Sequence, residues 1–184
     1  HARCAEYLEG EEKLAGLAVE LGGEAAVVHS AYHRTAQAYY KVVGPPRSFY
    51  ESALLYLSYT PHDSMSPEER YSLATDLSLA ALTGDGVHNF GELVTHPILA
   101  SLRATPNAWL LDTMLAAGDG DVARFRKVAR EHAAAAALQP ALVGRGRAVE
   151  EKVTLLAVVD LAFRRDADDR TITFAEVAER AGVG

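Results

Sequence analysis

The stretch that most constrains the fold of this chain is residues 83–97, which read TGDGVHNFGELVTHP. It lies between two long segments whose apolar residues recur at helical spacing, and it interrupts both of them. Gly84, Asp85 and Gly86 predict the end of the preceding helix, with glycine in the left-handed conformation that closes a last turn. The sequence therefore predicts a sharp break between two helical parts of the chain.

The second half of this stretch predicts a short helix of its own. Asn89 is placed to cap that helix by accepting a hydrogen bond from a backbone N–H two or three residues further on. Phe90 and Leu93 give the helix an apolar side, and Pro97 limits its length. Because a flexible linker would not contain apolar residues at this density, we interpret residues 83–97, called the elbow below, as an ordered segment packed against its flanking helices.

The remainder of the chain alternates helical patterns with short loops, and each pattern has one apolar side. This arrangement favours antiparallel helix pairs stacked into a right-handed solenoid. No strict sequence period is visible, so a regular repeat family is not demonstrated. The last long pattern predicts the longest helix, with Val149, Val153, Leu156 and Phe163 as its apolar stripe. The helices are expected at residues 3–21, 25–43, 48–59, 67–82, 105–118, 122–138 and 140–165, with a short helical piece at residues 97–102.

Two capping boxes mark helix starts, because a Ser or Thr is followed three residues later by Glu in each. The second box follows residues 170–173, whose β-branched composition predicts a short strand. Ile172 and Val177 sit where a hydrophobic staple would hold this last helix, and Gly182 is placed to end it. The paired residues of the boxes are Ser66 with Glu69 and Thr173 with Glu176.

Composition excludes several classes of protein. Hydrophobic residues make up 49% of the 184 residues, which argues against disorder. A net charge of −7 argues against a nucleic-acid surface, which needs a basic stripe. The single cysteine, Cys4, excludes an internal disulfide and favours a reducing compartment. No apolar run reaches a membrane span. Because the sequence opens on His1, we expect it to be an excerpt of a longer protein.

Four stretches together resemble the 26S proteasome non-ATPase regulatory subunit 13 family, which belongs to the PCI-domain proteins. The first is GDGVHNFGELVTHPIL (residues 84–99), which resembles the signature stretch of that family. The resemblance extends in order, with few gaps, over most of the chain from about Tyr39 onward. The other three stretches are TPNAWLLDTMLAAGDGDVARF (residues 105–125), EKVTLLAVVDLAFRR (residues 151–165) and RTITFAEVAERAGV (residues 170–183).

The resemblance implies an all-α fold, a right-handed helical-repeat (TPR-like) solenoid that leads into a truncated winged helix. Residues 1–45 would form an N-terminal helical-repeat arm, residues 46–166 the helical part of the PCI domain, and residues 167–184 the incomplete start of the winged helix. The expected residues for fold and assembly are Gly84, Gly86, Asn89, Phe90 and Gly91 in the elbow, with Ile172, Phe174 and Val177 at the start of the winged helix.

The resemblance also implies a function: a non-catalytic scaffold subunit of the proteasome lid that acts in ubiquitin-dependent protein degradation. Its partners would be other PCI-domain lid subunits in a hetero-oligomer, with neither nucleic acid nor membrane, in the cytoplasm and nucleus. Three alternatives stay open. They are a PCI subunit of the signalosome or of a translation initiation factor, a nucleic-acid-binding PCI protein, and an α-helical enzyme with a dispersed site.

No catalytic residue, metal or cofactor is expected from the candidate motifs. The pair His29 and His33 lacks a third ligand for zinc and favours packing or solvation. The GDG of the elbow follows a helix and lacks the Gly-Lys of a phosphate loop, so helix termination is favoured. The downstream ligands of a calcium loop do not follow Asp119.

Local structural roles are favoured for the other polar candidates as well. His88 and His96, which flank the elbow, favour hydrogen bonding within the turn. Arg145, Arg147 and Lys152 predict a small basic patch that is solvated or contacts a protein. Seven tyrosines gather in the first helix pairs, where packing between repeats is favoured over a peptide-binding surface. They are Tyr32, Tyr39, Tyr40, Tyr50, Tyr56, Tyr59 and Tyr71.

Overall fold

The structure, a computed structural model, describes residues 25–165 and 171–182, and all regular elements in these ranges are helices. The predicted all-α class is confirmed. The helix expected at residues 3–21 and the turn at residues 167–169 lie outside the described ranges. The elements are α3 (Ala25–Val43), α4 (Pro46–Tyr59), η2 (His62–Ser64), α5 (Pro67–Thr83), α6 (Gly91–Thr95), η3 (Pro97–Leu102), α7 (Ala108–Gly118), α8 (Val122–Glu131), α9 (Ala133–Ala137), α10 (Gly146–Phe163) and α11 (Phe174–Ala181).

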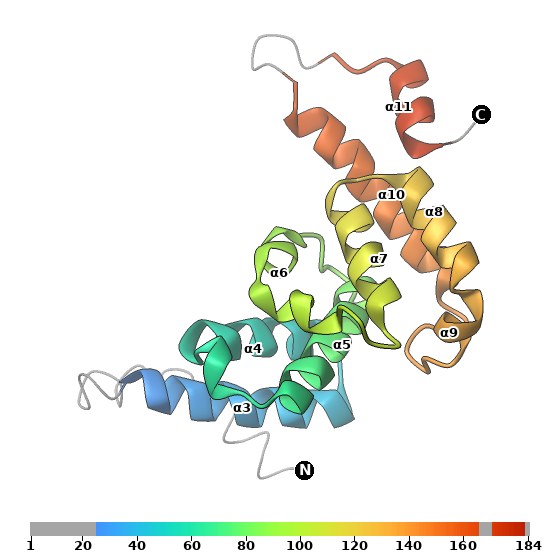
Figure 1. The fold of residues 1–184 in the computed structure, drawn as a ribbon. Coiled ribbons are helices and arrows are strands. Elements are labelled where there is room, and N and C mark those ends of the chain that lie inside the picture. The colour runs from blue at the N-terminus through green and yellow to red at the C-terminus, as the bar shows by residue number, and fades with distance from the viewer. Residues whose placement is uncertain (1–24, 166–170, 183–184) are drawn as a thin grey trace.

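Consecutive helices pack as neighbours along the molecule. The α3–α4 pair makes the most extensive contact, followed by α4 with α5 and α7 with α8. Figure 1 shows α3 and α4 at one end, α5 to α7 in the middle, and α10 leading toward α11 at the opposite end. Short connections of this kind join antiparallel neighbours, so the predicted helical-repeat architecture is confirmed. None of the described helices is both long and apolar enough to cross a membrane.

The α5 helix is the centre of the core, which the sequence did not predict. Its residues 77–83 are all buried, so this half of the helix has no solvent-facing side. The α5 helix contacts α4, η3, α7 and α10, and these neighbours surround it. Small side chains such as Ala80, Ala81 and Ser78 let the neighbours approach closely, and the hydroxyl of Ser78 donates to the carbonyl of Ala74 at 2.7 Å. The expectation that every helix buries only one side is therefore wrong for α5.

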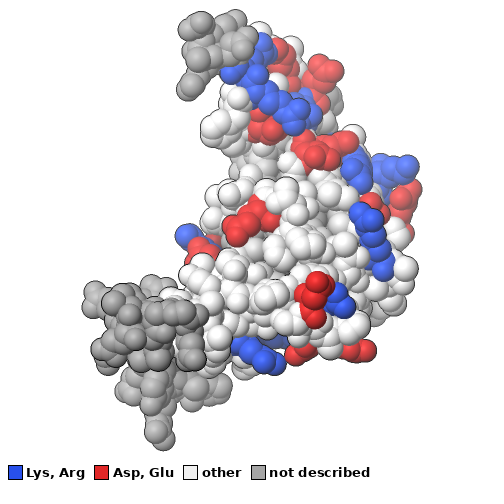
Figure 2. All heavy atoms as spheres, turned by 60° about the vertical axis from the view of Figure 1, so that its left-hand side comes forward, with Lys and Arg blue, Asp and Glu red and all other residues white. Residues whose placement is uncertain are grey.

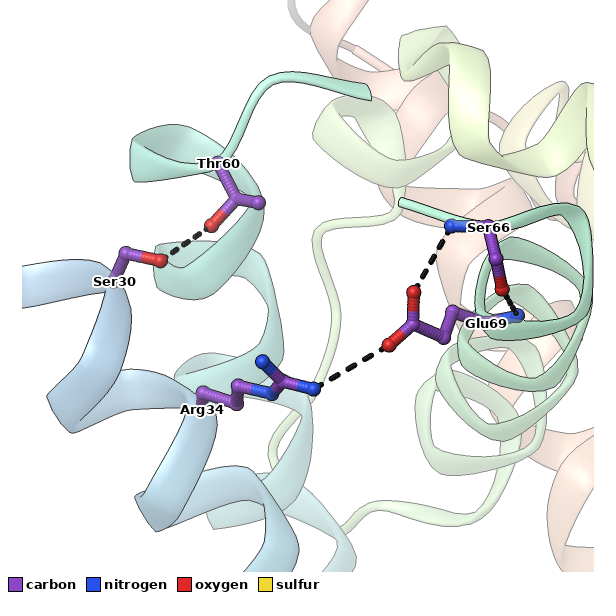
Figure 3. Close-up of polar contacts among 5 residues, drawn as sticks. All are labelled: Ser30, Arg34, Thr60, Ser66 and Glu69. Carbon is purple, nitrogen blue, oxygen red and sulfur yellow. Dashed lines mark hydrogen bonds and ion pairs between the residues drawn. The ribbon is translucent and has the colours of Figure 1, made fainter. Parts of the chain in front are cut away.

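The start of α5 also connects this helix to the N-terminal pair (Figure 3). The backbone N–H of Ser66 donates to Glu69 Oε2 at 2.9 Å, and the N–H of Glu69 donates to Ser66 Oγ at 3.2 Å. This capping box confirms the prediction for Ser66. The second carboxylate oxygen of Glu69 accepts from Arg34 of α3 at 3.3 Å, while Ser30 and Thr60 join α3 to α4 at 2.7 Å. Because the Arg34–Glu69 pair is exposed, it contributes only about 0–1 kcal/mol.

The single helix predicted at residues 122–138 is divided into α8 and α9. The break is at His132, whose φ of −112° and ψ of 23° are not helical. Its ring stacks against Trp109, with the ring centroids 6.5 Å apart. The alanines that follow favour helix but have little apolar surface to fix its direction, so a short second helix follows at a new angle.

The helix predicted at residues 140–165 is shorter than expected. Residues 140–145 form turns, and Gly144 has a φ of +72°, which a continuous right-handed helix excludes. The α10 helix therefore has 18 residues, fewer than the 19 of α3. Val149 and Val153 of the predicted stripe are buried, but Phe163 is 84% exposed. One turn beyond Val153, the fully buried residue is Ala157, which was not part of the predicted stripe.

Candidate functional site

The elbow begins where α5 ends, as predicted, but the backbone conformation differs from the expectation. Gly84 has a φ of −74° and is not left-handed, and its N–H donates to the carbonyl of Ala80 at 2.7 Å. Gly86 has the positive φ, at +76°. Gly84 is required for space instead, because a Cβ there would lie 2.7 Å from the oxygen of Ala80 and 2.9 Å from Cγ2 of Val87.

We expect Gly84→Ala to lower the free energy of unfolding by about 1–3 kcal/mol, because the added methyl overpacks a site bounded by backbone. Gly146→Ala is the matched control, since a Cβ at Gly146 meets nothing within 4 Å. At this helical position alanine is expected to stabilise by roughly 0.5–1 kcal/mol. Urea unfolding of both variants measures the difference, and equal effects would contradict the steric role of Gly84.

The α6 helix is anchored on both its polar and its apolar side. Asn89 Oδ1 accepts from the N–H of Gly91 at 3.0 Å, which is the predicted hydrogen bond, but Asn89 lies one residue before the N-cap of α6, which is Phe90. The hydroxyl of Tyr50 donates to the carbonyl of Asn89 at 3.1 Å, and burial raises the pKa of Tyr50 to about 12. Phe90 and Leu93 are 3% and 0% exposed. The elbow is thus an ordered part of the core, as the sequence predicted.

Two cations, Lys152 in α10 and Arg145 directly before it, hold the end of α5 against the elbow. Lys152 Nζ donates to the carbonyl oxygens of Ala81 at 2.6 Å and Gly84 at 2.8 Å, and it lies 5.4 Å from the centre of the Phe90 ring. Arg145 donates to the carbonyl of Thr83 at 3.0 Å. The last carbonyls of a helix lack intrahelical partners and form the negative end of its dipole, so cations are stabilising there. We call this arrangement the elbow clamp.

The elbow clamp corrects the interpretation of Arg145, Arg147 and Lys152 as one solvated or protein-contacting patch. Of the three, only Arg147 is a solvated surface cation, because its side chain is 93% exposed and pairs with Glu151 one turn further along α10. The other two bind backbone about 60–70 residues away in the sequence. No local signal in the sequence indicates such a pairing, because it depends on how α10 packs against α5.

Lys152 gives the clamp a pH dependence. Burial lowers the pKa of its ammonium group from 10.5 to about 8, and the nearby Asp85 carboxylate offsets part of this shift. Between these two values the unfolded chain binds the proton that the folded chain has released, so the contribution of Lys152 to stability rises with pH. A neutral amine retains two N–H donors for the two carbonyls.

We therefore expect an NMR titration of the Lys152 side chain to give a midpoint near pH 8. Between pH 8 and 10.5, titration of Lys152 is expected to increase the free energy of unfolding of the wild type as the pH rises. Lys152→Met should lack this increase, since the variant has no ammonium group to titrate. A midpoint near 10.5, the ordinary lysine value, would contradict the burial of this group.

Of the other polar candidates, His96 and His29 have structural contacts, whereas the side chain of His88 is exposed and makes none of the predicted hydrogen bonds with the described residues. His96 Nδ1 accepts from the N–H of Ile98 at 3.1 Å, which is the predicted bonding within the turn. Burial, with the neighbouring His62, lowers the pKa of His96, whereas Glu92 raises it. His29 stacks on Tyr59 with centroids 4.7 Å apart, in keeping with the predicted packing. Within residues 25–165 and 171–182, no three His, Cys, Asp or Glu side chains are grouped to hold a metal ion.

The aspartates of the former calcium-loop candidate belong to a tight helix connection. The carboxylate of Asp121 accepts from the N–H of Arg124 at 2.9 Å and caps α8. Gly120 has a φ of +63°, and a Cβ there would lie 3.0 Å from Cα of Ala157 in α10. The turn is thus shaped for close approach of α7, α8 and α10.

The second group of candidates, Ile172, Phe174 and Val177, lies at α11. The predicted capping box is present, with Thr173 Oγ1 accepting from the N–H of Glu176 at 3.3 Å, and Gly182 ends the helix at a φ of +61°. Ile172 and Val177 are half-buried, whereas Phe174 is 95% exposed.

The strand predicted at residues 170–173 is not formed in its described part, residues 171–173, although the backbone at Thr173 is extended. A strand needs a partner for its backbone groups, and the neighbour of α11 is a helix, α10. Figure 1 shows α11 at the end of the molecule formed by α10 and α8, well away from α6, so the two groups of candidates do not form one site.

Ion pairs and backbone contacts hold α11 in place. Arg180 binds Asp160 of α10 at 2.8 Å and the carbonyl of Asp119 at 2.9 Å. Arg126 of α8 donates to the carbonyl of Gly182 at 2.8 Å. The α11 helix is therefore held against α8, α10 and the turn at Asp119, whereas Phe174 at its start takes no part in these contacts and is exposed to solvent.

Comparison with known proteins gives a consistent family. The sequence model described as PSD13 N-terminal repeats matches residues 5–114, more than half of the chain. The 26S proteasome non-ATPase regulatory subunit 13 homologs B and A of Arabidopsis thaliana are 42% and 41% identical to it over 153 residues, or 83% of this chain and 38% of each relative. Subunit 13 of Dictyostelium discoideum is 33% identical over 177 residues, or 96% of this chain and 45% of the relative.

The chain thus spans less than half the length of these relatives. The matched region includes the elbow, α5 and most of α7, which are the elements that form the centre of the core. The chain therefore belongs to the 26S proteasome non-ATPase regulatory subunit 13 family.

Proposed function

We propose that the chain is a non-catalytic scaffold part of the lid of the 26S proteasome regulatory particle, acting in ubiquitin-dependent protein degradation through protein–protein assembly. The observation that supports this proposal best is the family match, because the relatives are named as non-ATPase regulatory subunits of that particle. The proposed partners are other PCI-domain lid subunits, and the proposed locations are the cytoplasm and nucleus.

The geometry of the elbow supports a scaffold role. Asn89 and His96 of the elbow accept from backbone N–H groups of the elbow and η3, and Lys152 of α10 donates to carbonyls at the end of α5. The contacts of Lys152 and Arg145 hold α10 against the end of α5, and a rigid body suits a subunit that must present surfaces to several neighbours. We further propose that the capped α11, with Ile172, Phe174 and Val177, begins a winged helix.

The charge distribution weighs against the nucleic-acid alternative. On the face drawn in Figure 2, Lys and Arg are interspersed with Asp and Glu rather than gathered in a stripe. At α11, Arg165 and Arg180 pair with Glu176 and Asp160. Neutralised arginines contribute little to phosphate binding.

Affinity purification of the tagged chain from cells, followed by mass spectrometry, tests the proposal. Recovery of the other regulatory-particle subunits is the expected result, with peptidase, deubiquitinase and nucleotide-hydrolysis assays of the isolated chain blank. Recovery of signalosome or initiation-factor subunits, or of nucleic acid, would favour an alternative assembly. Intrinsic activity abolished by one substitution in this chain would contradict the non-catalytic role.

A further inference from the structure

A large apolar cavity lies between α7, α8, α9 and the start of α10. Its volume is about 740 Å³, within the range of about 300–1,000 Å³ that is usual for small-molecule sites. Its floor consists of Leu82, Trp109, Phe125 and Val149, all of which are buried. We call it the α8–α10 pocket, and it is separate from the elbow clamp.

Small residues on the walls keep this pocket open. Ala133, Ala136 and Ala137 of α9 line one side, and Gly144 and Gly146 line the other. A Cβ added at either glycine would meet no atom within 4 Å. The break at His132 and the turns before α10 thus produce a concave apolar surface instead of two helices packed in direct contact.

The polar groups of the pocket differ in whether they are paired. Arg126 and Glu150 neutralise each other, with Nε and Oε1 2.6 Å apart. Arg130 lines the same pocket and is exposed, and its guanidinium has no hydrogen bond or ion pair with any described residue. Trp109 is 5% exposed, and its Nε1 is a buried donor that has no acceptor within residues 25–165 and 171–182. The pocket therefore combines an apolar interior with an unpaired cation and an unsatisfied N–H donor.

We propose that the α8–α10 pocket binds an amphipathic small molecule with an apolar body and one carboxylate head group. The apolar body would cover the floor around Trp109 and Phe125, because burying apolar surface is favourable. The carboxylate would pair with the guanidinium of Arg130, which is suited to bidentate binding of carboxylates. This inference is independent of the proposed assembly role.

The fluorescence of Trp109 provides a direct test, because it is the chain's only tryptophan. The full chain is titrated with decanoate, below the concentration at which decanoate forms micelles, and in parallel with decanol. We expect a saturable change in emission with both probes and tighter binding of decanoate. Arg130→Gln is expected to weaken decanoate binding about tenfold or more without changing decanol binding.

Two matched controls separate this site from general apolar adsorption. Lys127→Gln removes a cation of the same helix that pairs with Glu131 and does not line the pocket, so it is expected to change decanoate binding less than about twofold. Ala133→Leu fills the pocket and should abolish binding of both probes, whereas Ala134→Leu, on a residue outside the lining, should not. Non-saturable signals, or equal behaviour of Ala133→Leu and Ala134→Leu, would overturn the proposal. Equal affinity of wild type and Arg130→Gln for decanoate would overturn the assigned head group.

Discussion

Phe90→Ala is expected to lower the free energy of unfolding by about 3–5 kcal/mol, the range for removing a fully buried aromatic side chain. Phe90 is 3% exposed and belongs to the same core cluster as Leu93 of α6. The loss has two parts, since the apolar contacts of the ring disappear and Lys152 loses the ring that lies 5.4 Å from its ammonium group. Chemical denaturation with a two-state fit measures the change.

Phe163→Ala is the matched control for this experiment. Its ring is 84% exposed near the end of α10, so the same substitution is expected to change stability by no more than about 0.5 kcal/mol. If the two variants lose similar amounts of stability, the ring of Phe90 is not in the core and the packed elbow is wrong.

Lys152→Met should be the second strongly destabilising change, by about 2–4 kcal/mol. Methionine keeps most of the apolar length of the side chain but removes the ammonium group. The carbonyls of Ala81 and Gly84 then lose a charged donor while they remain largely covered, and hydrogen bonds to charged groups contribute about 1.5–3 kcal/mol each. Thermal and urea unfolding are measured at pH 7 and again at pH 10.5. Because the contribution of Lys152 to stability rises with pH between about 8 and 10.5, the loss in Lys152→Met is expected to be larger at the higher pH.

Arg147→Met isolates the effect of position from the effect of charge. It removes one positive charge from the same helix, but its exposed ion pair with Glu151 contributes only about 0.3–0.5 kcal/mol. A Lys152→Met variant as stable as Arg147→Met would show that α10 does not hold the end of α5. Hydrogen exchange should locate the loss: the amide of Gly84, bonded to Ala80, is expected to lose protection first in Lys152→Met.

Local chemistry explains which parts of this fold could be predicted from the sequence. The hydrogen bonds that Ser66, Asn89 and Thr173 accept at helix starts join residues two or three positions apart, and such pairs are visible in the sequence itself. The density of apolar residues in the elbow likewise indicated burial, and Phe90 and Leu93 confirm it. The assembly roles expected for the elbow and for α11 stay predictions.

The features that the sequence did not reveal depend on contacts between distant segments. Lys152 looks like a surface cation until α10 is placed against the end of α5. The complete burial of residues 77–83 depends on which helices surround α5. Phe163 is the converse case, a residue predicted to be buried that is exposed. It follows the helical period of Val149 and Val153, but the core does not extend along α10 as far as its ring. Periodicity gives the apolar side of a helix but not how far the neighbouring core extends along it.

The central claim, that this chain is a structural part of the 26S regulatory particle, is tested most directly by native mass spectrometry. The particle is purified from the cells that produce the chain, through a tag on a different regulatory subunit, so that the chain is recovered only if it is bound. We expect the chain to be present in a stoichiometric amount and to leave the particle only when the particle itself is dissociated. A particle of otherwise complete composition that lacks the chain, with the chain recovered free or in another assembly, would contradict it.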